Sequence, residues 1–167
     1  LRTPKANRDT LFRHFLATWH TSDLKAPAEF QDAKADLLPA LRARAMLEID
    51  LHRIADDFRS RADMPLQVIA DHLAAMLVYD LPSSTMSISN EQLDAWGMSF
   101  YEAMEIALQN LRERTTEYVQ IGSVYAFGCG DAYDATRLLL TDLIEALEVE
   151  GDTIAMVPNR DRLYVCG

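Results

Sequence analysis

From about residue 63 onwards, the chain contains short apolar runs separated by turn residues. The longest run, residues 74–79, ends just before Pro82, and a glycine-serine pair separates two further runs at 118–121 and 124–127. Short apolar runs between turn signals are typical of β-strands, and a two-residue turn that contains glycine is typical of a hairpin. These features predict a largely antiparallel sheet.

Helical signals lie between the strands and in the first third of the chain. Ser99 and Glu102 have the spacing of a capping box, which predicts a helix to about residue 114, and further helices are predicted at 90–97 and 131–147. An N-terminal helix is predicted over about 7–19, and a second helical region carries Pro39, which predicts a kink or restart there. An apolar stripe at helical spacing follows it: Leu47, Leu51, Ile54 and Phe58.

Taken in order, the predicted elements are N-terminal helices followed by ββααββαββ. Because the strands are short and mostly linked by hairpins, this order predicts an α+β fold, with a mostly antiparallel sheet of about five to six strands and helices packed on one face. The order is not a series of βαβ units, and the sequence has no glycine-rich phosphate loop of the Rossmann or P-loop type.

Charge is distributed unevenly over the 167 residues. The chain has 16 basic and 26 acidic residues, which gives a net charge of -10. The N-terminal helical segment, residues 1–62, holds 11 basic and 9 acidic residues, a net charge of +2. The acidic α+β segment, residues 63–167, holds 5 and 17, a net charge of -12. The total length suits one compact domain made of both segments.

This asymmetry indicates which partners the chain can have. Binding to nucleic acid neutralises phosphates, so a net-acidic chain is a poor candidate for it. The acidic segment can lie against the slightly basic helices of its own chain. Alternatively, it can face a basic protein partner or a missing part of the same chain.

The number of cysteines and the hydropathy of the sequence indicate in which cellular compartment the protein lies. The two cysteines, Cys129 and Cys166, are too few for a disulfide framework, which favours a reducing cytoplasm. No run approaches the roughly 20 apolar residues of a membrane span, and the sequence does not start with a signal-peptide pattern. We therefore expect a cytoplasmic protein that does not contact a membrane.

The most site-like stretch is residues 128–131, Gly-Cys-Gly-Asp, where a strand is predicted to pass into a helix. Unpaired backbone N–H groups there would lower the pKa of the Cys129 thiol and favour a nucleophile. No histidine lies nearby in the sequence to act as its base. The alternative, which we favour, is that Cys129 is a small core residue between the glycines of a tight turn.

Asp131 and Asp134 are three residues apart at the start of the predicted helix, on one face of its first turn. Two carboxylates at this spacing can bind a metal ion or share a proton. The alternative needs no chemistry: Asp131 caps the helix and Asp134 interacts favourably with the helix dipole. We favour this second interpretation.

Asn159, Arg160 and Asp161 precede Arg162 in the connection between the last two predicted strands. Arginine side chains beside an amide can hold a carboxylate or a phosphate. In the alternative, Asn159 and Asp161 bond to their own backbone in a hairpin turn, and Arg160–Asp161 is an exposed ion pair of little energetic value.

The sequence lacks the common motifs of catalysis and metal binding. HExxH, CxxC and GxSxG are all absent. We therefore expect no cofactor and no metal site, and the sequence favours a protein that is not an enzyme.

Five stretches between residues 73 and 167 resemble the YtpQ-like bacterial proteins, a family of unknown function. They are 79–82 (YDLP), 93–99 (LDAWGMS), 107–111 (ALQNL), 134–140 (DATRLLL) and 155–163 (AMVPNRDRL). The resemblance implies a soluble bacterial protein of the cytosol and no particular activity. It also singles out polar positions that could connect helix and sheet: Asp80, Asn110, Asp134, Arg137, Asn159, Arg160 and Asp161.

These observations favour a non-enzymatic binding or interaction module with an acidic surface. The first alternative is a small-molecule-binding domain or a hydrolase-like enzyme, with its site where residues 129–131 approach 159–162. A third reading is a toxin-neutralising protein, because acidic inhibitors suit basic nucleases.

Overall fold

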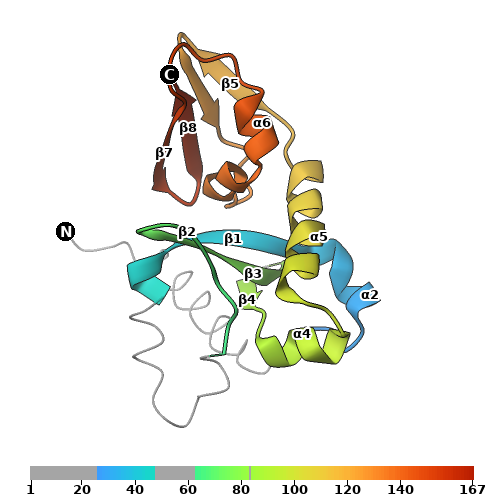
Figure 1. Cartoon of the computed structure of the whole chain (residues 1–167). Helices are drawn as coiled ribbons and strands as arrows, with labels where there is room; N and C mark the ends of the chain where they lie inside the picture. The colour runs from blue at the N-terminus through green and yellow to red at the C-terminus, as the bar shows by residue number, and fades with distance from the viewer. Residues whose placement is uncertain (1–25, 48–62, 83) are drawn as a thin grey trace, which may run out of the picture.

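The computed structural model describes residues 26–47, 63–82 and 84–167. These residues form two four-stranded antiparallel sheets. In Figure 1 one sheet lies above the other, and helix α5 (Phe100–Glu113) leads from the lower sheet towards the upper one. The predicted α+β class is confirmed.

The first sheet is centred on β3 (Leu73–Leu81), which contains the longest apolar run of the sequence. Its other strands are β1 (Leu37–Ala43), β2 (Gln67–Ala70) and β4 (Ser84–Ser87), all paired with β3. Residues 74–78 are all buried, so β3 has core on both faces. A continuous apolar run suits such a strand better than an alternating one.

Helices pack against this sheet. The short helices α2 (Phe30–Ala33) and η2 (Lys34–Asp36) precede β1, and α4 (Asn90–Trp96) precedes α5. The predicted capping box of Ser99 and Glu102 opens α5. Gly97 ends α4 in the left-handed conformation, with φ of 66°, as its position in the sequence predicts.

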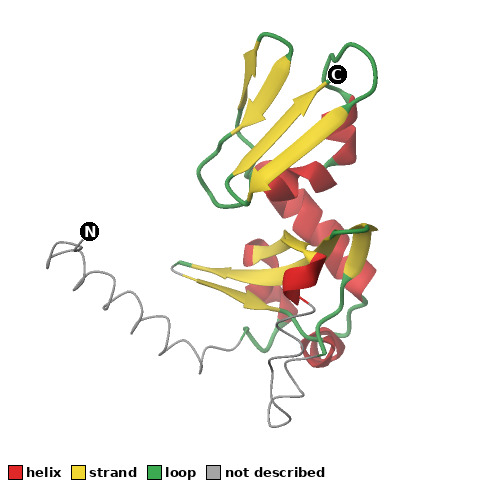
Figure 2. Cartoon of the chain, turned by 90° about the vertical axis from the view of Figure 1, so that its left-hand side faces the viewer, coloured by secondary structure: helices red, strands yellow, loops and turns green. Residues whose placement is uncertain are grey.

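The second sheet has the strand order β5 (Tyr118–Ile121), β6 (Val124–Phe127), β8 (Arg162–Cys166) and β7 (Ile154–Asn159). Figure 2 shows this sheet towards the viewer, with helices behind it. The helices behind it are η4 (Ala135–Leu139) and α6 (Thr141–Glu145). The core between them is formed by Tyr125, Phe127, Ile144, Leu147, Leu163 and Val165.

The two sheets are joined by a shared core and by hydrogen bonds. Tyr133 and Leu140, which flank η4, pack against Leu38 and Met76 of the first sheet. Thr136 Oγ1 accepts a hydrogen bond from the backbone N–H of Leu41 at 3.1 Å. The helical connection between β6 and β7 therefore ties the second sheet to the edge of the first.

Residues 37–43 form strand β1, so the kinked helix predicted around Pro39 is wrong. The strand lies at the edge of the sheet and pairs with β3, with Pro39 opposite Leu77. An edge strand tolerates proline because only one side of its backbone bonds to a neighbour. Residues 37–41 are buried in succession, which fits a strand between two apolar layers and not a one-sided helix.

The single sheet of five to six strands is also wrong, because the described residues form two sheets of four strands. From β3 onwards the elements follow the predicted ββααββαββ order, with η4 and α6 in place of the predicted helix at 131–147. Ala132 has a φ of 67°, which an α-helix cannot include, so the helical turns begin only after it. The helix predicted over 7–19 and most of the stripe from Leu47 to Phe58 lie outside the described residues.

Candidate functional site

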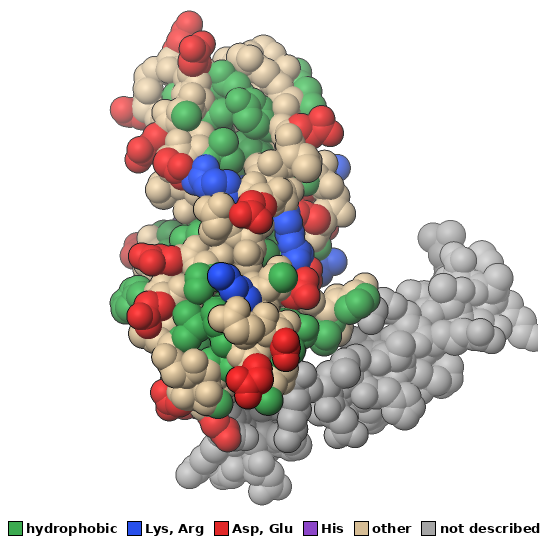
Figure 3. Space-filling model, turned by 90° about the vertical axis from the view of Figure 1, so that its right-hand side faces the viewer, with side chains coloured by type: hydrophobic (Ala, Val, Ile, Leu, Met, Phe, Trp, Pro, Cys, Tyr) green, Lys and Arg blue, Asp and Glu red, His purple; other side chains and the backbone are tan. Residues whose placement is uncertain are grey.

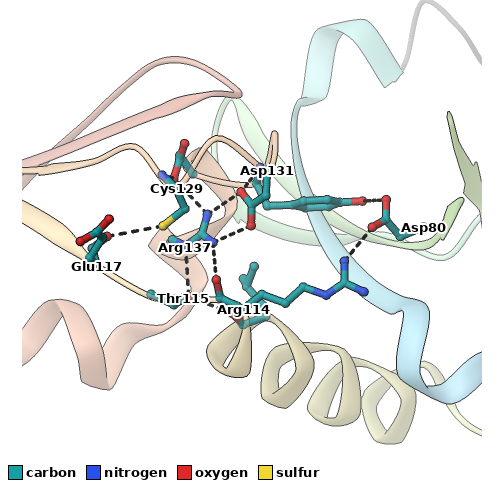
Figure 4. A network of polar contacts seen from close by, with 10 residues as sticks. Asp80, Arg114, Thr115, Glu117, Cys129, Asp131 and Arg137 are labelled. Atoms are coloured by element: carbon teal, nitrogen blue, oxygen red, sulfur yellow. Dashed lines mark hydrogen bonds and ion pairs between the residues drawn. The ribbon is translucent and has the colours of Figure 1, made fainter. Parts of the chain in front are cut away.

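Polar residues predicted from the sequence gather where the two sheets meet. Figure 4 shows Arg137 between Asp131 and the end of α5, with Asp80 of β3 further along the same network. Asp134 lies beside Arg137, and its Oδ1 accepts a hydrogen bond from the backbone N–H of Cys129 at 2.9 Å. We call Arg137 and the groups that it contacts on Asp131, Asp134, Thr115 and Arg114 the arginine junction.

The Arg137 side chain is fully buried, and its donors are all used within the protein. It forms a two-pronged pair with Asp131, with Nη1–Oδ1 at 2.9 Å and Nη2–Oδ2 at 2.6 Å. The other bonds reach Asp134 Oδ1 at 3.0 Å, Thr115 Oγ1 at 3.0 Å and the carbonyl oxygen of Arg114 at 3.2 Å. Because a guanidinium has five N–H donors, these bonds leave none for a ligand.

Asp134 is as deeply buried as Arg137. Its Oδ1 accepts from Cys129 and Arg137, whereas its Oδ2 has no hydrogen-bond partner among the described residues. A buried oxygen without a donor costs about 1–3 kcal/mol. The position of Asp134 therefore depends strongly on the charge of Arg137.

A second chain of polar contacts continues from the arginine junction to the first sheet. Tyr133 donates its hydroxyl to Asp80 Oδ1 at 2.9 Å, and Arg114 Nη1 contacts Asp80 Oδ2 at 2.7 Å. Arg114 also reaches Asp36, at 3.1 Å between Nη2 and Oδ1. These contacts hold β3, the end of α5 and the segment before η4 in one arrangement.

The electrostatics of the junction favour the charged pair. Burial raises the pKa of Asp131, but hydrogen bonds from Arg137 and from the backbone of Tyr133 outweigh it and leave the pKa lowered. Burial lowers the pKa of Arg137, and the hydrogen bond and charge of Asp131 outweigh this to raise it. Burial and the hydrogen bond to Asp80 raise the pKa of Tyr133, so its hydroxyl remains a donor.

The lowered pKa of Asp131 predicts a pH dependence of stability. A carboxyl whose pKa is lower in the folded state stabilises the fold above its unfolded value, about 3.9, and loses that contribution as the pH falls through the folded value. We expect Asp131→Asn to lower the free energy of unfolding at pH 7 by about 1–3 kcal/mol. The difference from the wild type should shrink below about pH 4.

Urea denaturation of both proteins between pH 3 and pH 7 measures this difference. Asp161→Asn is the matched control, because Asp161 is exposed and its pair with Arg160 lies on the surface. A difference between wild type and Asp131→Asn that is constant across this pH range would refute the role assigned to the carboxylate.

Cys129 is partly buried beside the junction, and its thiol donates to the carbonyl oxygen of Glu117 at 3.4 Å. It precedes Gly130, which has a φ of 77°, in the turn after β6. The turn agrees with the interpretation favoured above, but Cys129 is only partly buried and is not a core residue. Cys166 is also free and lies at the end of β8. Arg162, at the start of β8, lies against Gly128 in this turn, and the four residues from Arg162 to Cys166 cover about 13 Å of strand. Cys166 is therefore far from Cys129.

The hairpin between β7 and β8 has the hydrogen bonds and the exposed ion pair that the turn interpretation predicts. Asn159 Oδ1 accepts from the backbone N–H of Asp161 at 2.9 Å, and Arg160 forms an exposed pair with Asp161 at 3.3 Å. The carbonyl oxygen of Arg160 accepts from the N–H of Ala135 at 3.0 Å. Arg162 also lies against Gly128, so the hairpin approaches the turn at 129–131 that the small-molecule alternative names.

Several residues of the network lacked a signal in the sequence. Thr115, Tyr133 and Arg114 stand in no motif, and their role follows only from the packing of α5 against η4. The family resemblance did single out Asp80 and Asn110. Asn110 Nδ2 donates to the carbonyl oxygens of Lys34 and Leu37 at 2.7 and 2.8 Å, so it connects α5 to the start of β1.

A different feature lies on the second sheet, on the face opposite η4 and α6. In the register of the strands, Val119, Ala126, Tyr164 and Met156 form one row across the four strands. Ile121 and Val124 pair in the next row, as do Cys166 and Ile154. We call these eight residues the open face.

The open face is apolar and unpartnered within the described residues. Val119, Ile121, Ile154 and Met156 are 57–68% exposed. No helix lies in front of this face in Figure 2. A half-buried strand normally alternates apolar and polar residues, so an apolar outer face departs from the usual pattern.

The two ends of the open face differ in charge. At the Ile154 end, the Glu148 carbonyl accepts from the Tyr125 hydroxyl at 2.9 Å, and the chain continues through exposed Glu150 and Asp152 to β7. At the other end lie Glu117, Arg160, Asp161 and Arg162. The Arg162 side chain extends over Gly128, and a Cβ added at Gly128 would lie 3.1 Å from Arg162 Nη1.

The acidic residues are not confined to one surface. Figure 3 shows the right-hand side of Figure 1. Acidic side chains are spread over the upper and lower parts of this view, and basic ones gather near the middle. Among the described residues, no three His, Cys, Asp or Glu side chains are grouped to hold a metal ion. Across this same part of the chain, every helix is too short or too polar to cross a bilayer.

Curated relatives carry the name UPF0354 protein. Those of Staphylococcus haemolyticus strain JCSC1435, Bacillus cereus strain AH187 and Bacillus thuringiensis subsp. konkukian strain 97-27 are each 29% identical over 107 residues, 59% of this chain. The match covers 38% of the first and 40% of the other two, so the chain spans about two fifths of their length. No family model and no solved structure matches the chain.

These relatives confirm the predicted resemblance to an uncharacterised bacterial family. The narrower YtpQ-like naming stays a prediction.

Proposed function

We propose that this protein is a protein-interaction module that binds its partner through the open face of the second sheet. The observation that carries the proposal is the pair of apolar rows across β5, β6, β8 and β7, which lack a covering element in the described structure. An exposed apolar patch that is bordered by polar residues can mark a binding surface. Such a patch can form the dry centre of an interface.

The arginine junction supports a structural role for the residues that would form the site in the hydrolase alternative. Arg137 uses its donors internally, and Asp131 and Asp134 neutralise it. The Cys129 thiol bonds to a backbone carbonyl, and within the described ranges no histidine is among its hydrogen-bond partners. A nucleophile needs a base within hydrogen-bond reach, so this geometry favours binding over hydrolysis.

Two aspartates placed on the open face test the proposal. Val119→Asp with Met156→Asp should leave folding intact, since both side chains are about 60% exposed. The variant should recover its partner from bacterial extract at least about tenfold less well than wild type, because an interface would bury both carboxylates unpaired. Affinity capture with quantitative mass spectrometry measures the ratio.

Val68→Asp with Tyr101→Asp is the matched control. These residues are also exposed, at 58% and 70%, but lie on β2 and α5, away from the open face. The pair adds the same charge and should leave partner recovery unchanged. Equal recovery by the two double variants would reject the open face as the binding surface.

A further inference from the structure

We infer that the partner of the open face presents apolar side chains flanked by lysine or arginine, an inference that rests on the proposed function. The rows of the open face supply the apolar part of the recognition. The residues beyond their ends supply the charge.

The two rows are too small to form a complete interface. Three strand spacings of about 4.8 Å give a width of about 14 Å, and two residues along a strand cover about 7 Å. A standard interface covers about 800 Å² of each partner. A partner that covers the rows must therefore also cover the polar residues at their ends, as the rim of an interface does.

The segment that leads into β7 at the Ile154 end is acidic. It holds the exposed residues Glu148, Glu150 and Asp152, and residues 138–159 contain no lysine or arginine. Glu148 lies towards the helix side, since its carbonyl oxygen accepts from the core residue Tyr125, whereas Asp152 directly precedes β7. At the other end, Glu117 and Asp161 are balanced by Arg160 and Arg162. Cationic groups of the partner are therefore attracted to the Ile154 end, and anionic groups are repelled there.

The same charges disfavour a second copy of this chain as the partner. Residues 115–167 hold 9 acidic and 3 basic residues, a net charge of -6. Two copies of this part of the chain, packed with their open faces together, would bring like net charges together across the interface. Juxtaposed like charges reduce both the rate and the strength of association.

Titration with two synthetic helical peptides tests the inference. One consists of leucine and lysine with the leucines on one face, and the other replaces each lysine by glutamate. We expect the leucine-lysine peptide to shift the amide NMR signals of Val119, Ala126 and Tyr164 in the full chain. The leucine-glutamate peptide should leave them unchanged.

Charge variants distinguish attraction of the peptide to this end of the sheet from its general attraction to an acidic protein. Changing Glu148, Glu150 and Asp152 to their amides should weaken binding of the leucine-lysine peptide about tenfold at low salt, and less at high salt. Changing Glu91, Glu105 and Glu113 to glutamine removes the same charge from α4 and α5. This control should change the dissociation constant by less than about twofold.

Three results would overturn the inference. They are equal binding of both peptides to the open face, equal weakening by both triple variants, and a stable dimer formed through the open face in sedimentation experiments. The first and third would leave the proposed function intact. The proposed function fails separately, when Val119→Asp with Met156→Asp does not reduce recovery of the partner.

Discussion

Replacing Arg137 by methionine should lower the free energy of unfolding by about 3–5 kcal/mol, because the change leaves buried carboxylates without their cation. Asp134 is fully buried, and the Asp131 side chain is only 27% exposed. Methionine fills much of the same volume but provides none of the hydrogen bonds. The loss should appear as a lower urea midpoint with an unchanged denaturant slope.

Arg160→Met is the control for this prediction. Arg160 is 69% exposed and pairs with Asp161 on the surface, so its loss should cost less than about 1 kcal/mol. Arg137→Lys should fall between the two variants, because lysine keeps the charge but cannot form the two-pronged bond. Equal destabilisation by Arg137→Met and Arg160→Met would contradict the assigned role of the junction.

A second change tests whether the loss comes from the unpaired carboxylates. Adding Asp134→Leu to Arg137→Met removes one of them, and replacing a buried ion pair by apolar groups is often nearly neutral. The double variant should therefore be more stable than Arg137→Met alone. An additive loss would show that Asp134 and Arg137 act independently.

Local signals in the sequence were sufficient for most elements from β3 onwards, apart from the helix predicted at 131–147, where the chain forms η4 and α6. The apolar run at 74–79, the capping box at Ser99 and the turn after Ile121 each depend on residues close together in the chain. Propensity and capping describe such short-range structure well. The same signals could not show that the strands divide between two sheets, since this depends on which strands pair.

Strand β1 shows where local reasoning fails. Pro39 in an apolar stretch indicates a broken helix when the segment is considered alone. Pairing with β3 and burial on both faces determine the strand, and neither can be read from residues 37–43. Tertiary contacts override local preference in this segment.

The candidate site was predicted in part. Asp131, Asp134 and Arg137 do lie together with Cys129, close to the hairpin that carries Asn159–Asp161. Arg137 also bonds to Thr115 and to the carbonyl oxygen of Arg114, which are distant in sequence. Its complete internal pairing could therefore not be predicted. This pairing is what favours a structural role over a binding one.

The open face had a signal in the sequence that charge obscured. Residues 118–121 and 124–127 are almost wholly apolar, although hairpin strands with helices on one side only should alternate. The net charge of -12 over residues 63–167 predicts an acidic surface instead. The structure places apolar rows between an acidic end and a neutral one, so both features belong to one region.

Cross-linking in living cells should give its largest signal from the open face. A photoreactive benzoylphenylalanine at Met156 or Val119 is expected to capture a partner protein upon illumination, because these side chains point out of the sheet and are 60% and 59% exposed. The same residue at Tyr101 on α5 is the control, since Tyr101 is 70% exposed and lies outside the open face.

This measurement tests most directly whether the second sheet is an interaction surface. The account predicts one dominant cross-linked species from Met156 and Val119 in the bacterium that produces the protein, with little or none from Tyr101. The Glu148, Glu150 and Asp152 amide variant should weaken this species. Cross-linking of equal strength from all three positions, or from none of them, would contradict the account.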